Sequence, residues 1–372
     1  MKKIGIITTS HAINYGAVLQ AYALRQTLLQ VGGVSVDIIN YCGDEAVAGR
    51  KLYRPGHSPK AMLYNALVFL KPAYRKNRAK LIALFDRFKA DKLGMQEKLF
   101  TSKAALQVSA RYDTLVCGSD QIWNLNLFDD DVYFLHFENP GLAKHYFAYA
   151  ASIAETLTPE QENKMRQYTA HFDAISIREQ DAATHMQNVL GREVLATVDP
   201  VYLLSTTDWD ALCADADNLV DGAYTLVFMI SHEERDQGVV NRLCKGTREK
   251  IVVLNLHPFS YLKGDQYVYT ASPAQFVKLI RNATRIITDS FHATSFSILY
   301  NKVVYNIRRS TRNTRIENLY RLFGMESRFV DGETQKLPEA VRYDEVNRNV
   351  EKAREHARAY LKQIVEVTTG DT

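Results

Sequence analysis

The sequence predicts an α/β protein with two Rossmann-like domains that face each other across a cleft, and with a C-terminal helix that packs back across the domains. Short apolar, β-branched runs alternate with helical stretches, which is the rhythm of βαβ units in a parallel sheet. The runs form two series, separated by a polar stretch around residues 206–221. A chain of 372 residues is also too long for one ordinary core.

Six runs lie in the first two hundred residues: KIGIIT, VDIINY, TLVCG, YFAYAAS, AISI and VLATVD. The second series is YTLVFMI, KIVVLNLH, QYVYT, RIITD and KVVYNI. Pro200 halts the sixth run, and the following STTDWDAL has the pattern of an N-capped helix. We therefore predict an N-terminal domain of residues 1–200, completed by the helical segment of 340–372, and a C-terminal domain of residues 201–339.

Composition places the chain among soluble globular proteins, with 46% hydrophobic and 24% charged residues. The apolar run in MKKIGIITTS is too short for a signal peptide, and no stretch approaches the roughly 18 to 20 apolar residues of a membrane span. We expect a cytoplasmic protein. Four cysteines lie far apart without CxxC spacing, which predicts reduced and mostly buried thiols: Cys42, Cys117, Cys213 and Cys244.

The net charge of +4 hides a strongly basic segment at residues 50–103. This segment holds fourteen Lys or Arg against Asp86, Asp91 and Glu97, a local excess of +11. Apolar and basic residues interleave over residues 61–89, as on helices at an anionic membrane surface. A helical pair with a solvated basic face is the alternative. We expect no nucleic-acid partner, because the pI of about 8.7 is modest and no nucleic-acid-binding motif is present.

The stretch TDSFHATSFS, Thr288 to Ser297, follows an apolar strand-like run and opens a helix. Ligands of α/β sheets bind outside the carboxyl ends of the strands, where the next helix offers backbone N–H groups to an anion. His292 therefore stands where chemistry is usually done. A buried histidine with satisfied hydrogen bonds is the alternative.

Further candidates follow other strands. In CGSDQIWN, Gly118 allows close backbone approach, Ser119 and Asp120 can cap a helix, and Trp123 offers a flat face for a sugar. The alternative is an ordinary β-to-α turn with a core tryptophan. In HAINYGAV, the residues at the turn after the first strand are Asn14, Tyr15 and Gly16.

Arginines supply candidate anion sites. Arg178, in ISIREQD, emerges from a strand end, where its planar fork suits a carboxylate or phosphate; a surface ion pair with Glu179 or Asp181 is the alternative. The segment NIRRSTRNTRIENL is dense enough in arginine to hold a phosphate or diphosphate, or else forms a solvated basic face: Arg308, Arg309, Arg312 and Arg315.

Several catalytic signatures do not occur in the sequence. There is no GxGxxG, no GxxxxGK[ST] and no GxSxG, which disfavours nicotinamide, P-loop and serine-hydrolase chemistry. The run Asp129 to Asp131 has no companion cluster, so we expect chemistry without a metal and without a cofactor.

Five segments together resemble the polysaccharide pyruvyl transferase family: NYGAVLQAYAL, GSDQIWN, ISIREQD, TVDPVYLL and TDSFHATSFSILYNK, in this order. The resemblance covers roughly Ile4 to Phe329. It implies a GT-B-like architecture and transfer of the enolpyruvyl unit of phosphoenolpyruvate to two hydroxyls of a sugar. The product is a pyruvate ketal in a bacterial cell-surface polysaccharide such as capsule or exopolysaccharide. One departure is Ala293, where many relatives have glycine.

The resemblance implies catalytic roles for Arg178 and His292, with phosphoenolpyruvate as co-substrate. The donor would be bound by Ser290, Phe291, Thr294, Arg308, Arg312 and Arg315. The acceptor would be bound by Asn14, Tyr15, Ser119, Asp120, Gln121 and Trp123. Asp120 and Asp289 are candidate bases for the acceptor hydroxyl, unless both are helix caps.

If the acceptor sugar is carried on a polyprenyl diphosphate, the basic segment 50–103 would attract anionic lipid at the inner face of the cytoplasmic membrane. Three further functions stay open: a nucleotide-sugar glycosyltransferase of the same architecture, a non-catalytic sugar-binding protein, and an enolpyruvyl transferase that makes an open vinyl ether without closing a ketal.

Overall fold

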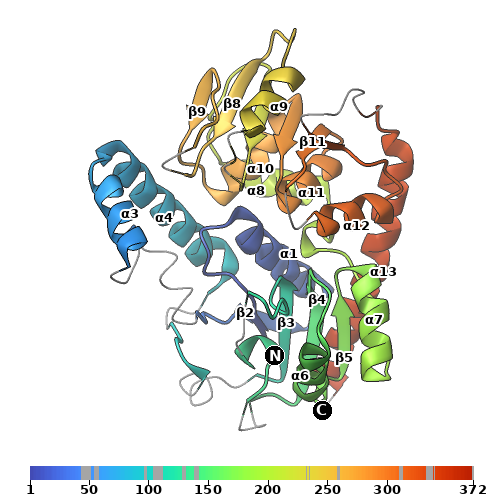
Figure 1. Cartoon of the computed structure of the whole chain (residues 1–372). Coiled ribbons are helices and arrows are strands. Elements are labelled where there is room, and N and C mark those ends of the chain that lie inside the picture. Colours follow the sequence, from blue (N-terminus) through green and yellow to red (C-terminus); the bar gives the residue numbers. More distant parts are fainter. Residues whose placement is uncertain are drawn as a thin grey trace. The chain divides into compact units, whose positions relative to one another are not determined.

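The computed structural model describes most of the chain as two compact units, each with its own parallel sheet (Figure 1). The described residues are 1–42, 52–53, 58–95, 99–103, 112–127, 131–137, 142–231, 233, 235–257, 260–309, 313–331, 338 and 340–370. By internal contacts the first unit comprises residues 1–50, 89–204 and 351–372, and the second comprises 51–88 and 205–350.

The first unit is built on six parallel strands in the order β2-β1-β3-β4-β5-β6. Its central strands are buried on both faces, as apolar β-branched sequences require in a parallel sheet. The strands are β1 (Lys2–Ile7), β2 (Val34–Ile38), β3 (Thr114–Asp120), β4 (His145–Ala151), β5 (Ala174–Ile177) and β6 (Leu195–Ala196).

Helices between these strands begin at polar residues that accept backbone N–H groups. Asn14 caps α1 (Tyr15–Val31), and Thr158 forms a capping box with Gln161 at the start of α6 (Pro159–Thr169). Helix α7 (Gln180–Leu190) ends at Gly191 in the left-handed conformation. Short 3-10 turns η1 and η3 cover Asp131–Phe134 and Pro200–Tyr202.

The second unit repeats the plan with six parallel strands in the order β12-β11-β10-β7-β8-β9. The strands are β7 (Tyr224–Phe228), β8 (Lys250–Leu254), β9 (Gln266–Val268), β10 (Arg285–Thr288), β11 (Val303–Ile307) and β12 (Phe329–Val330). The intervening helices are α8 (Thr206–Cys213), α9 (Arg235–Leu243), α10 (Pro273–Asn282), α11 (Phe291–Leu299) and α12 (Thr314–Leu322).

The helical pair expected in the basic segment is α3 (Pro59–Phe69) and α4 (Pro72–Leu93). Helix α13 (Tyr343–Gly370) contributes residues to both units. Its first part bonds to the second unit, where Asn349 donates to the Phe323 carbonyl. Its later part bonds to the first unit, where Arg354 donates to the Tyr202 carbonyl and Tyr360 donates to the Ala148 carbonyl.

The predicted fold class, two α/β domains each with a parallel sheet, is confirmed. The predicted helix at STTDWDAL is α8, which opens with a capping box between Ser205 and Asp208. The predicted boundaries, 1–200 with 340–372 and 201–339, stay a prediction; by contacts, residues 51–88 group with the second unit. All four cysteines are free and buried, as expected.

Candidate functional site

Polar side chains of the first unit collect at the carboxyl edge of its sheet. Adjacent strands in a parallel sheet end at the same edge, so residues far apart in the sequence meet there. Sheet order places the end of β3 between the ends of β1 and β4, with β5 and β6 beyond. The residues at this edge include Thr8, Thr9, Ser119, Asp120, Ser152, Arg178, Glu179 and Asp199.

Arg178 is the central cation of this cluster and is only 8% exposed. Its Nη2 lies 2.9 Å from Asp199 Oδ2 and 4.0 Å from Asp120 Oδ1, and it donates to Ser119 Oγ at 2.7 Å. The alternative of a surface ion pair with Glu179 or Asp181 is therefore not the arrangement found, because the guanidinium is buried beside Asp199. These contacts hold the planar fork in one orientation.

The turn that carries Ser119 and Asp120 is held by a buried network. Gln20 donates to Thr8 Oγ1 at 2.8 Å and accepts from the Ser119 backbone N–H at 3.1 Å. Thr8 Oγ1 donates to the Ser119 carbonyl at 3.0 Å, and Ser119 Oγ donates to the Ala150 carbonyl at 2.7 Å. Ser119 is fully buried and thus supports Arg178 from within the protein.

Gly118 permits this turn, as its place in CGSDQIWN suggested. Its φ is +120°, and a Cβ built there would lie 2.1 Å from the Tyr149 carbonyl oxygen on the neighbouring strand β4. A side chain is excluded at that distance. The close approach is between two strands of the protein.

Asp120 does not cap a helix, since residues 121–127 form turns. Its Oδ2 accepts from Thr9 Oγ1 at 3.0 Å, and its side chain keeps 14% exposure. Its backbone lies in the left-handed region at φ +73°. Asp120 is thus a partly exposed carboxylate fixed beside a buried guanidinium.

A second buried carboxylate borders the cluster at Glu179. Ser152 Oγ donates to Glu179 Oε1 at 2.5 Å, and the residue is 5% exposed. Nearby, burial raises the pKa of the Tyr149 hydroxyl well above its usual range, and Asp199 acts in the same direction. Tyr149 therefore stays neutral and donates to the Val198 carbonyl at 3.1 Å.

The aromatic residues expected to stack on a sugar lie inside the protein. Trp123 is fully buried, parallel to Phe134 at 5.5 Å, and its Nε1 donates to the Tyr133 carbonyl. Tyr15 is only 2% exposed. The alternative of a core tryptophan is what the structure shows, because apolar packing occupies the ring faces that a sugar would need.

Asn14 and Gln121 remain near the surface. Asn14 is exposed, and its Oδ1 caps α1 by accepting from the Gly16 and Ala17 N–H groups at 2.9 and 3.4 Å. Gln121 is half-buried and accepts from Asn124 Nδ2 at 3.3 Å. Of the predicted acceptor residues, Asp120, Asn14 and Gln121 are thus the ones with accessible surface.

In the second unit, TDSFHATSFS forms the end of β10 and the buried helix α11. All nine residues of α11 are buried. Its hydroxyls bond to carbonyls one turn back: Thr294 to Ser290, Ser295 to Phe291 and Ser297 to Ala293. These hydroxyls let a polar sequence form a buried helix, because each satisfies its own donor locally.

Two predictions for this helix change accordingly. Thr294 is fully buried, and its Oγ1 also accepts from Asn306 Nδ2 at 2.8 Å. It therefore links α11 to β11 and is covered from a donor substrate. Ala293 is fully buried too, so its methyl group is covered by protein and does not narrow a ligand's approach.

Asp289 holds a loop and does not cap α11. Its two oxygens accept from the Ile230 and Ser231 N–H groups at 2.6 and 2.8 Å, and Arg309 Nε lies 3.4 Å from Oδ2. Ser290 is the residue that caps α11. Because the Asp289 carboxylate is fully buried and already bonded, it is a poorer candidate base than Asp120.

His292 lies in the first turn of α11 and is 7% exposed. Its ring meets Phe291 edge-on at 5.2 Å, and the Arg315 guanidinium lies over the Phe291 ring at 5.6 Å. Arg309 contacts Asp289, and Arg315 contacts Phe291. Both arginines therefore lie next to the N-terminus of α11. Such a helix N-terminus flanked by arginines favours an anion.

The described arginines of the predicted group have separate partners. Arg308 pairs with Glu317 at 2.9 Å, and its guanidinium lies over the Phe329 ring at 4.5 Å. Arg312 lies outside the described residues. Arg309, a member of the arginine group predicted to hold a phosphate, lies beside Asp289, with its Nε 3.4 Å from Oδ2.

Asp199 is the main residue that the sequence reasoning missed. It stands directly before Pro200, after the last strand of the first sheet, and bonds both Arg178 and the Val201 N–H. Its position in TVDPVYLL could have indicated this role. Asp199 follows the last strand of the sheet, and the carboxyl ends of parallel strands lie on the same side of the sheet as Arg178.

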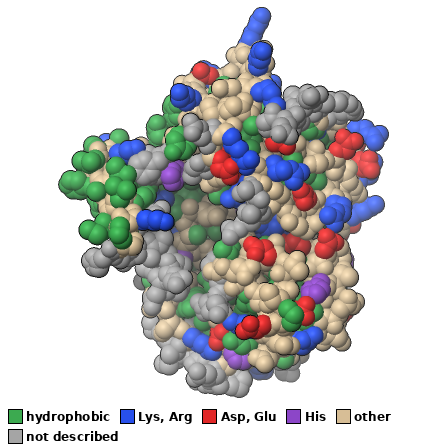
Figure 2. Space-filling model, viewed as in Figure 1, with side chains coloured by type: hydrophobic (Ala, Val, Ile, Leu, Met, Phe, Trp, Pro, Cys, Tyr) green, Lys and Arg blue, Asp and Glu red, His purple; other side chains and the backbone are tan. Residues whose placement is uncertain are grey.

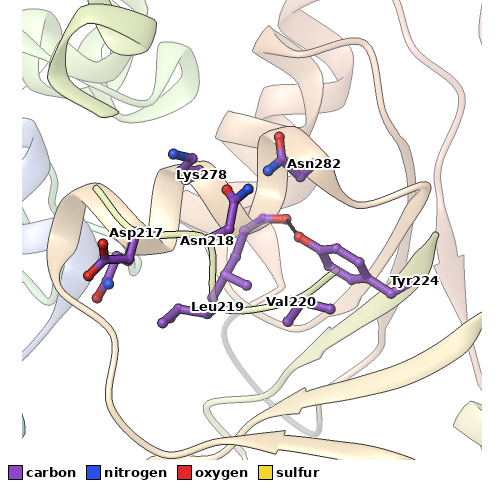
Figure 3. Close-up of a pocket in the computed structure, with 9 residues that line it drawn as sticks. Asp217, Asn218, Leu219, Val220, Tyr224, Lys278 and Asn282 are labelled. Carbon is purple, nitrogen blue, oxygen red and sulfur yellow. Dashed lines mark hydrogen bonds between the residues drawn. The ribbon is translucent and has the colours of Figure 1, made fainter. Parts of the chain in front are cut away.

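The hollow drawn in Figure 3 lies at the amino-terminal edge of the second sheet, opposite the edge where His292 lies. It is lined by residues 217–220, by one face of α10 and by Tyr224, the first residue of β7. Tyr224 donates to the Leu279 carbonyl at 2.7 Å. Its place at the amino ends of the strands separates it from His292 and argues against a substrate site.

The chain aligns with several solved structures at low sequence identity. UDP-GlcNAc 2-epimerase from Methanocaldococcus jannaschii, in complex with UDP-GlcNAc and UDP, aligns with a TM-score of 0.52 at 12% identity over 99% of both chains. The enzyme from Neisseria meningitidis aligns with a TM-score of 0.48 at 11% identity over 100% of both chains. Escherichia coli heptosyltransferase WaaC with ADP gives 0.41 at 9% identity over 96% of this chain and 99% of that one.

A comparison with curated proteins found no match. The family model for polysaccharide pyruvyl transferase matches residues 14–311, which contain Arg178, His292 and all five segments that carried the resemblance. The chain belongs to the polysaccharide pyruvyl transferase family.

Proposed function

We propose that the protein transfers the enolpyruvyl unit of phosphoenolpyruvate to two hydroxyls of one sugar in a cell-surface polysaccharide or its precursor. The observation that carries the proposal is the family match over residues 14–311, which spans both Arg178 and His292. The product is a pyruvate ketal, the reaction needs no cofactor, and we place it in the cytoplasm.

The reaction needs an acid that protonates a carbon of the donor and a base that takes a proton from a sugar hydroxyl. A proton adds to the methylene carbon C3 of phosphoenolpyruvate, and the first sugar hydroxyl bonds to C2 while losing its proton to a base. The bond between C2 and the phosphate oxygen then breaks, and the second hydroxyl bonds to C2. Its proton leaves with phosphate, so the sugar gains the atoms of pyruvic acid less one water.

His292 serves the donor in this proposal. Phosphoenolpyruvate carries a phosphate and a carboxylate, which the N-terminus of α11 and the adjacent Arg309 and Arg315 suit electrostatically. An imidazole there can bind the phosphate and donate or accept a proton.

In this proposal Arg178 stabilises charge on the departing phosphate, and Asp120 removes a proton from the acceptor hydroxyl. The contacts to Asp199 and Ser119 preorganise the Arg178 guanidinium, which supports a role in stabilising charge as phosphate departs. Asp120 is the candidate base, since its carboxylate is partly exposed and oriented by Thr9.

Phosphate release from phosphoenolpyruvate by the purified protein tests the proposal. The acceptor panel should include galactose, mannose and N-acetylhexosamines, both free and linked to lipid diphosphate. Acceptor-dependent release, with a quaternary ketal carbon in the carbon NMR spectrum of the product, is the expected result. A vinyl carbon pair would identify an open enolpyruvyl ether. No release, with turnover of sugar nucleotides, would replace the proposal with a glycosyltransferase.

Replacing His292 with Ala or Gln is expected to lower kcat by about 100- to 10,000-fold, the usual contribution of a general acid–base group. Initial rates of phosphate release check this. The matched control is His185→Ala, because His185 is a surface residue paired with Glu162. Wild-type rates in both His292 variants would remove His292 from the mechanism while leaving the reaction assignment intact.

Replacing Asp120 with Asn is expected to lower kcat by on the order of 100-fold while binding of phosphoenolpyruvate is unchanged. Asparagine tolerates the left-handed backbone of this position, so the fold should be kept. Calorimetric binding and steady-state rates check the two halves of the prediction. Asp344→Asn, on the exposed start of α13, is the control. A fall in donor affinity with kcat unchanged would reassign Asp120 to donor binding.

A further inference from the structure

Helix α3 presents an apolar outer face, the reverse of an ordinary surface helix. Its inner face consists of buried Ala61 and Val68 with half-buried Tyr64 and Asn65, at the i, i+3, i+4, i+7 spacing of one helix side. The outer residues and the turn after them are exposed by 39 to 73%: Met62, Leu63, Leu67, Phe69 and Leu70. Figure 2 shows these hydrophobic side chains gathered over α3 at the left of the view.

The apolar face lies in a stretch of sequence that is rich in cations and free of acids. Residues 59–85 contain six Lys or Arg and neither Asp nor Glu. Lys60 precedes the apolar face, and Lys71, Lys76 and Lys80 follow it; all four are exposed. The Arg75 guanidinium lies over the Phe69 ring at 5.1 Å, which places a cation directly at the apolar tip.

We propose that α3 and the start of α4 dock on the surface of an anionic lipid bilayer. The outer leucines and Phe69 would enter the headgroup and acyl boundary, while the long lysine stems carry their charges to lipid phosphates. Contiguous exposed apolar surface of this kind marks an interaction site.

Charge favours a lipid surface over a second copy of the chain. A two-fold interface would set the same patch against itself and bring these cations together without acids to offset them. Anionic lipid supplies the missing negative charge. Within the part of the chain that the structure describes, no helix is long and apolar enough to cross a membrane.

Flotation with vesicles tests the proposal without using activity, so it is independent of the proposed reaction. The full-length protein should float with vesicles of phosphatidylcholine containing about one-third phosphatidylglycerol and should not float with phosphatidylcholine alone, since anionic lipid provides the charge term. Added salt should weaken binding.

Two variants separate the apolar and the electrostatic contributions. Lys71→Gln/Lys76→Gln/Lys80→Gln should lower vesicle affinity by on the order of 100-fold, at roughly fivefold per lysine. Leu63→Ser/Phe69→Ser/Leu70→Ser should abolish flotation. The matched controls remove exposed residues elsewhere, Lys245→Gln/Lys263→Gln/Lys352→Gln and Val31→Ser/Leu322→Ser, and should float as wild type.

A tryptophan reporter shows whether α3 itself enters lipid. Leu70→Trp should shift to shorter emission wavelength with anionic vesicles and be quenched by brominated lipid, whereas the native Trp123 and Trp209 are fully buried and should not respond. The proposal would be overturned if the wild-type protein failed to float. It would also be overturned if the protein did not bind vesicles and instead formed a concentration-dependent dimer that the Leu63, Phe69 and Leu70 substitutions abolish.

Discussion

Arg178→Ala is expected to abolish detectable turnover and to lower the free energy of unfolding of the first unit by about 3–5 kcal/mol. The guanidinium lies 2.9 Å from the buried Asp199 carboxylate and 4.0 Å from Asp120. Removing it leaves Asp199 inside the protein without that compensating charge. Urea unfolding followed by fluorescence measures the stability change, and phosphate release measures the activity.

The two effects can be separated by changing both partners. Arg178→Met/Asp199→Leu removes the buried charges together and should recover most of the lost stability while staying inactive. Arg235→Ala, which breaks an exposed pair with Glu233, is the matched control and should cost less than about 1 kcal/mol. The two units can unfold in separate transitions, so the comparison concerns the transition that the Arg178 variants shift. An active Arg178→Ala variant would show that the arginine serves only the fold.

Gly118→Ala is expected to destabilise the first unit by about 2–6 kcal/mol, the sum of an unfavourable backbone conformation and a steric clash. The added Cβ would lie 2.1 Å from the Tyr149 carbonyl oxygen, which belongs to a buried central strand and has little room to move. The turn that carries Ser119 and Asp120 would shift, so activity should fall as well. Thermal and urea unfolding measure the loss.

Gly191→Ala isolates the backbone contribution. Gly191 also has positive φ, +64°, but a Cβ there meets nothing within 4 Å. This control should cost only about 1 kcal/mol. Equal losses in the two variants would mean that β4 yields to the methyl group, and that the close approach at Gly118 is not what requires glycine.

Much of the fold was predictable because periodicity reports burial locally. Eleven of the twelve described strands coincide with apolar runs picked out from the sequence. The exception is β12, Phe329–Val330, whose two apolar residues stand between polar neighbours and form no longer apolar run. Helix starts such as Ser205 were also readable, because a capping box is a contact between residues three apart.

The candidate site was predictable only in part. Arg178 and His292 could be singled out from their positions after strands, and the structure places each at the carboxyl edge of its sheet. The partners could not be assigned, since Asp199 lies 21 positions after Arg178 and Ser119 lies 59 before it. Trp123 was predicted to contact the acceptor sugar, but its ring packs on Phe134. Residue type alone does not tell whether an aromatic ring faces solvent or the core.

By itself the sequence determined the two α/β domains, the strand-end positions of Arg178 and His292, and the uneven distribution of charge. These are local or compositional properties of the chain. Only the tertiary structure decided that Asp199 compensates Arg178, that the hydroxyls of α11 bond within their own helix, and that the apolar side of α3 faces outward. Each of these depends on which side of an element is covered, and that follows from packing between segments far apart in the sequence.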